Sequence, residues 1–72
     1  MHFPQILINI MEEKQMTTYR LSKETGISDS LLGSYRSGRS DPSSANLVKI
    51  ADALQVSVDY LLGRTGNPEV NR

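Results

Sequence analysis

The chain has 72 residues, a formal net charge of zero from eight basic and eight acidic residues, and no Cys. This length holds one small domain with a minimal core, and the lack of Cys excludes a disulfide scaffold, a zinc finger and Cys-based catalysis. No apolar run approaches the roughly 18 residues that span a bilayer, and the start MHFPQILINIMEEK has no signal-peptide pattern, so we expect a cytoplasmic protein without a membrane partner.

The apolar residues have helical spacing throughout, and no stretch alternates as a half-buried strand does. The first helix is predicted over residues 3–14, and Ile8 lies off its apolar stripe, either as a dimer contact or as an isolated exposed apolar residue. A second helix is predicted over 18–25, with Thr17 as its N-cap. Gly26 then supplies the left-handed conformation that ends helices. The stripe of the first helix consists of Phe3, Ile6, Leu7 and Ile10.

A third helix is predicted over residues 29–37, with Ser28 as its N-cap and Gly38 as its end. The turn-rich loop SGRSDP follows it. Either Ser43 or Ser44 caps the fourth helix. The fourth helix carries apolar residues at i, i+3, i+4 and i+7, namely Leu47, Ile50, Ala51 and Leu54.

Ser57 is predicted to cap the fifth helix, which ends at Gly63. Asp59 in its first turn suits the helix dipole. The apolar residues of this helix are Val58, Leu61 and Leu62. Residues 64–72 form a polar tail with Gly and Pro that we expect to fray. The sequence therefore predicts an all-α domain of five short helices over residues 1–63, followed by a tail.

Residues 17–38 contain two short helices joined by a tight turn. Gly26 permits the sharp change of direction, and Ile27 is expected to fill the angle between the two helices. This pattern is typical of a helix-turn-helix, in which the second helix enters the major groove of DNA with its N-terminus leading.

The faces of the third helix follow from its rotation of about 100° per residue. Leu31, Leu32 and Tyr35 are predicted to face the core. Small side chains on the opposite face would allow close approach to a groove floor, and hydroxyls can pair with any base. A merely solvated surface has the same composition. The outward face consists of Ser30, Gly33, Ser34 and Ser37, flanked by Asp29 and Arg36.

Gly33 lies in the middle of this face. Gly costs about 1 kcal/mol of helix stability relative to Ala. We therefore interpret Gly33 as a position where close contact with a ligand is favourable. Asp29, by contrast, could accept from a cytosine amino group but is repelled by phosphates.

The charges are unevenly distributed along the chain. Between Lys14 and Lys49 there are six basic and three acidic residues, which gives this stretch a charge of +3, whereas the flanks are acidic. This distribution permits phosphate binding but does not require it. The six basic residues are Lys14, Arg20, Lys23, Arg36, Arg39 and Lys49.

The stretch from Ile6 to Gly63 resembles the XRE family, the Cro/CI-like helix-turn-helix domains of phage repressors and bacterial regulators. The matching segments are MEEKQMTTYRLSKETGIS, YRSGRSDPS and above all LVKIADALQVSVDYLLG. The resemblance implies a compact five-helix lambda-repressor-like domain. It also implies a homodimer on a two-fold operator in double-stranded DNA, with the fourth and fifth helices and the tail at the dimer surface.

The resemblance also implies which residues contact DNA. Thr17 and Thr18 match the start of the second helix, where the family anchors a phosphate, and Arg39 matches a basic residue that touches the backbone. The sequence departs from the family at Asp29, where Arg, Gln or Asn is more frequent, and at Gly33, which is unusual. The base-reading positions of the family match Ser28, Asp29, Ser30 and Ser34.

A further departure concerns the first and third helices. The family often pairs an Arg late in the first helix with a Glu near the end of the third. This chain has Met11 and Arg36 at those positions. Our hypothesis is that Arg36 supplies the phosphate-facing cation that the first helix no longer offers.

These observations predict a sequence-specific regulator of transcription, a repressor, that inserts residues 28–37 into the major groove. The alternative is a protein-interaction or antitoxin-like module with weak or no DNA binding. An enzyme is not expected, because Glu12 and Glu13 point to different helix faces and His2, the only His, has no partner at ligand spacing. We expect no metal, cofactor or small-molecule ligand.

Overall fold

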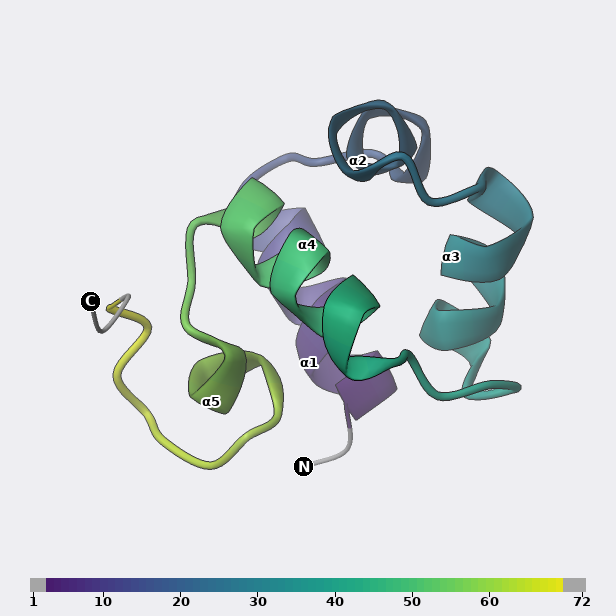
Figure 1. The fold of residues 1–72 in the computed structure, drawn as a ribbon. Helices are drawn as coiled ribbons and strands as arrows, with labels where there is room; N and C mark the ends of the chain where they lie inside the picture. Colours follow the sequence, from purple (N-terminus) through teal and green to yellow (C-terminus); the bar gives the residue numbers. More distant parts are fainter. Residues whose placement is uncertain (1–2, 70–72) are drawn as a thin grey trace.

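The computed structural model describes residues 3–69 and contains five helices there. Figure 1 shows α2 and α3 together at one side of α4, with α5 at the opposite side. α1 packs against α3 and α5, and α2 packs against α3 and α4. The predicted all-α, five-helix architecture is confirmed. The helices are α1 (Phe3–Glu13), α2 (Thr18–Thr25), α3 (Asp29–Ser37), α4 (Ser44–Leu54) and α5 (Val58–Leu61).

Four of the helices begin at a hydroxyl residue that accepts a hydrogen bond from the backbone N–H three residues later. The donor–acceptor distances lie between 3.0 and 3.2 Å. Each bond satisfies one of the free N–H groups in the first turn of a helix. The predicted caps are confirmed, and Ser43 rather than Ser44 caps α4. The four N-caps are Thr17, Ser28, Ser43 and Ser57.

The helix ends agree less closely with the sequence. Gly26 and Gly38 adopt the predicted left-handed conformation, with φ of 78° and 80°. α5 ends at Leu61 rather than at Gly63, and the exposed Leu62 follows it as the C-cap. α4 ends at Leu54, and its C-cap is Gln55, a non-glycine residue with a left-handed φ of 59° that the sequence did not indicate.

The sequence predicts a frayed tail, but residues 64–69 make backbone hydrogen bonds to residues 57 and 59. The backbone N–H of Arg64 donates to the carbonyl of Asp59 at 2.8 Å, and that of Ser57 donates to the carbonyl of Pro68 at 3.0 Å. This part of the tail therefore returns to the start of α5 (Figure 1).

The core explains how α3 is oriented. Leu32 and Tyr35 are buried as predicted, and the Tyr35 hydroxyl accepts a hydrogen bond of 2.9 Å from Nδ2 of Asn46 in α4. Leu31, however, is 36% exposed. The prediction that Leu31 faces the core is wrong, because the core contacts α3 on the side of Leu32 and Tyr35 and leaves Leu31 on the flank of the helix.

Candidate nucleic-acid interface

The turn between α2 and α3 is fixed by side chains. Ile27 is buried at the junction, as predicted. Its carbonyl accepts from the hydroxyl of Ser22, and its N–H donates to Oγ1 of Thr25 at 3.1 Å. Thr25 Oγ1 in turn donates to the carbonyl of Leu21 at 2.8 Å. These bonds fix the end of α2 and the turn that leads into α3, while the buried Ile27 packs at the junction of the two helices.

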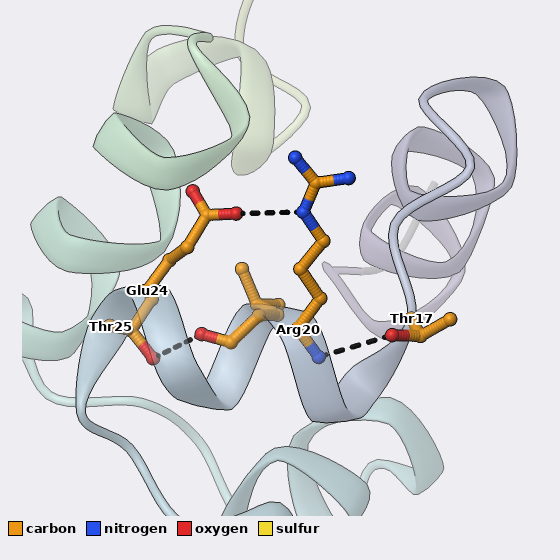
Figure 2. A network of polar contacts seen from close by, with 5 residues as sticks. Thr17, Arg20, Glu24 and Thr25 are labelled. Atoms are coloured by element: carbon orange, nitrogen blue, oxygen red, sulfur yellow. Dashed lines mark hydrogen bonds and ion pairs between the residues drawn. The ribbon is translucent and has the colours of Figure 1, made fainter.

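Figure 2 shows the polar contacts along α2. Thr17 Oγ1 accepts from the backbone N–H of Arg20, and Arg20 Nε donates to Oε2 of Glu24 at 3.1 Å. The two side chains of this ion pair are 67% and 40% exposed, so the pair contributes little to stability. Its consequence is electrostatic: the charge of Arg20 is balanced locally, and the net positive charge of the α2–α3 region comes from other residues.

The face of α3 away from the core is open. Gly33 and Ser30 are exposed and Ser34 is half-buried, while Ser28 and Asp29 are exposed at the start of the helix. A Cβ added to Gly33 would meet no atom within 4 Å. Of the predicted outward face, Ser30, Gly33 and Ser37 are therefore exposed and Ser34 is half-buried, and their contact with DNA stays a prediction.

Arg36 connects the end of α3 to the start of α2. Its Nη1 donates to Oγ1 of Thr18 at 2.7 Å, across 18 residues of sequence. A guanidinium is thereby held at the N-terminus of α2, where backbone N–H groups are free and favour an anion. Within the described part of the chain Arg36 forms no ion pair, so its charge is not neutralised. Met11, the other member of the departure from the family, is buried in the core.

A shallow groove of about 510 Å³ lies beside this contact. Ile8 lines it and is half-buried, so the interpretation as an isolated exposed side chain is wrong, whereas a dimer contact at Ile8 stays a prediction. The groove is formed by the second half of α1, the link to α2, the first residue of α2 and one residue of α3. Its lining residues are Ile8, Met11, Glu12, Gln15, Met16, Thr17, Thr18 and Arg36.

The remaining predicted site residue, Arg39, is exposed in the loop after α3, and it too forms no ion pair within residues 3–69. One arrangement on α2 was not predicted from the sequence: Tyr19 is 63% exposed, and Nζ of Lys23 lies 5.3 Å from the centre of its ring. The i, i+4 spacing of these two residues on one helix was the available indication.

The structure offers no obvious metal centre in the range that it describes. No group of three or more His, Cys, Asp or Glu that could hold a metal ion lies within residues 3–69. His2 lies outside these residues. No helix in the same range is both long and apolar enough to cross a membrane.

A family model described as "Helix-turn-helix" matches residues 7–61. The chain belongs to this helix-turn-helix family. The match confirms the resemblance to the XRE, Cro/CI-like class and includes all five helices from the middle of α1 to the end of α5.

This helix-turn-helix protein is similar in sequence to proteins described as regulators of transcription. It is 39% identical over 69 residues to the cryptic phage CTXphi transcriptional repressor RstR of Vibrio cholerae, with 96% of this chain and 62% of the relative covered. It is 34% identical over 65 residues to an HTH-type transcriptional regulator, YobD, of Bacillus subtilis, with 90% of this chain and 58% of the relative covered. The chain thus spans less than two thirds of the length of either relative.

A solved structure has the same fold as this helix-turn-helix protein. It is the crystal structure of the P22 c2 repressor protein in complex with a synthetic operator, with a TM-score of 0.83 and 23% sequence identity. The match covers 90% of this chain and 98% of the other. It confirms the lambda-repressor-like fold.

Proposed function

We propose that this chain is a sequence-specific double-stranded DNA-binding regulator of transcription, a repressor, that places α3 in the major groove. The observation that carries the proposal is the open face of small polar residues on α3 beside the unneutralised guanidinium of Arg36. Small hydroxyl side chains can lie close to base edges and accept or donate. The family and the name of the repressor relative from Vibrio cholerae support the same function.

The phosphate contacts of this proposal lie around the base-reading face. The N–H groups at the start of α2, the side chains of Thr17 and Thr18 and the cations Arg36 and Arg39 would hold the sugar-phosphate backbone. Ser28, Asp29, Ser30, Gly33 and Ser34 would face the bases. Phosphate contacts fix the register of the protein on the duplex, whereas base contacts choose the sequence.

We also propose the organisation of the protein. Residues 1–63 form the DNA-binding domain and 64–72 its tail, and the cytoplasmic protein acts by binding, without catalysis, as a homodimer on a two-fold operator. The exposed apolar side chains of Val48 in α4 and Leu62 after α5 support a dimer surface on these helices. The mass measured by light scattering, alone and with DNA, tests it: a monomer on both occasions contradicts the dimer.

The function is tested by selection from a pool of randomised duplexes. We expect the selected duplex to bind at least about a thousandfold more tightly than a scrambled duplex at physiological salt. Equal affinity for both duplexes would contradict sequence-specific binding. Flow-through from a heparin column at low salt would favour the protein-interaction module instead.

Arg36→Ala tests the cation at the start of α2. We expect weaker binding to selected and scrambled duplexes alike, because a phosphate contact carries no sequence information. The slope of log K against log salt should become shallower by about one unit for each subunit bound. Arg64→Ala is the control for the loss of one arginine, since Arg64 lies beyond α5 and its exposed side chain is paired with Asp59 at 3.9 Å rather than placed beside α2. An unchanged slope for Arg36→Ala would exclude the contact.

Gly33→Ala separates stability from binding. The added Cβ meets no atom in the free protein, so we expect the free energy of unfolding to rise by about 0.5–1 kcal/mol. We expect affinity for the selected duplex to fall, because the same methyl group would separate α3 from the groove floor. Urea unfolding and duplex titration measure the two effects. A variant that is more stable and binds as well as the parent would show that Gly33 makes no close contact.

A further inference from the structure

Leu31 is an exposed apolar side chain on a helix face that is otherwise polar. It is 36% exposed, whereas its neighbour Leu32 is completely buried. Ser34 lies one turn further along the same side of α3, and the adjacent Ser30 belongs to the outward face. Leu31 is therefore located at the edge of the surface proposed to enter the major groove.

The side chains of the serines on either side of Leu31 are shorter than that of the leucine. Ser30 and Ser34 are short, so the leucine projects beyond them. Single exposed apolar residues are common on protein surfaces. In the proposed complex, however, Leu31 would lie against the edges of base pairs instead of in bulk water. Among the groups that base pairs present in the major groove, the C5-methyl of thymine is the apolar one.

We propose that Leu31 contacts the C5-methyl group of a thymine and thereby selects thymine at that position of the operator. The inference rests on the proposed function, because it needs α3 in the major groove. Leu31 would then be a specificity-determining residue: its contact exists only in the complex and distinguishes thymine from the other bases. Burial of one methyl-sized group changes an affinity by about fourfold.

The test removes the methyl group from the DNA. Each thymine of the selected duplex is replaced in turn by deoxyuridine, which lacks only the C5-methyl. For the parent protein we expect about fourfold weaker binding at the thymine that Leu31 contacts. For Leu31→Ala we expect weaker binding to the thymine duplex and no further loss with deoxyuridine at that position. Other positions should respond equally in both proteins.

Two variants accompany this measurement. Gln5→Ala shortens an exposed side chain on α1, outside α2 and α3 and outside the proposed dimer surface, and should keep the full response to deoxyuridine. Leu31→Asn keeps the size and branching of the side chain without its apolar end and should lose the response as Leu31→Ala does. It also provides a second reading if Leu31→Ala unfolds in a thermal scan.

The outcomes separate the two proposals. If the parent protein is insensitive to deoxyuridine at every position, or if the Leu31 variants keep the response of the parent, the inference about Leu31 is overturned while DNA binding stands. If no duplex is selected from the random pool, the proposed function fails, and the inference fails with it.

Discussion

Leu32→Ala is expected to lower the free energy of unfolding by about 2–5 kcal/mol. Leu32 is completely buried in α3, where it joins the core formed with α1 and α2. Truncation removes apolar burial and leaves a cavity that the surrounding helices fill only in part. Small domains have a total stability of about 5–15 kcal/mol, so a large share would be lost. Urea unfolding followed by circular dichroism measures the change.

Leu31→Ala is the matched control for this prediction. The same side chain is truncated one position earlier, on the same helix, but Leu31 is exposed. We expect a change within about 0.5 kcal/mol, as for other surface substitutions. Equal losses from the two variants would contradict the orientation of α3, and with it the assignment of the outward face.

Ser30→Glu is expected to reduce affinity for the selected duplex by about a hundredfold or more. The new carboxylate would lie on the outward face of α3, close to phosphates and without a cationic partner. Burial of an unpaired charge costs several kcal/mol, and each 1.4 kcal/mol is about tenfold in affinity. The fold should tolerate the change, because Ser30 is exposed and an acidic residue suits the first turn of a helix.

Gln5→Glu is the control for the added charge. Gln5 is exposed in the first turn of α1, outside the α2–α3 surface. The substitution removes the exposed hydrogen bond that Gln5 Nε2 donates to Asn9. The two variants have the same net charge, so a general electrostatic effect would appear in both. Anisotropy titrations at one salt concentration compare them. Equal weakening by both substitutions would remove the evidence for α3 as the contact.

The helix boundaries were predictable because local chemistry determines them. A hydroxyl residue at the start of α2 or α3 satisfies free N–H groups whatever the rest of the chain does, and Gly26 and Gly38 reach a backbone conformation that other residues reach only with strain. Thr17 and Ser28 could therefore be assigned as caps from sequence alone. The end of α4 could not, since Gln55 adopts a left-handed φ without being Gly.

The orientation of individual side chains was less predictable. Helical periodicity places Leu31 at the edge of the apolar stripe, and its burial depends on which neighbouring helix passes closest to α3. Arg36 posed the same difficulty: the sequence suggested a cation facing phosphate, but the contact with Thr18 joins residues 18 positions apart. Such contacts follow from the angle between α2 and α3, which no local pattern specifies.

The most direct measurement of the central claim is a map of backbone amide shifts in two-dimensional NMR spectra as the selected duplex is added. If α3 enters the major groove, the largest changes will occur at residues 28–37 and at the start of α2 near Thr17 and Thr18, and α4 and α5 will change only where a dimer forms on the DNA. Changes confined to α4 and α5, with the amides of α3 unmoved, would contradict the claim that this helix reads DNA.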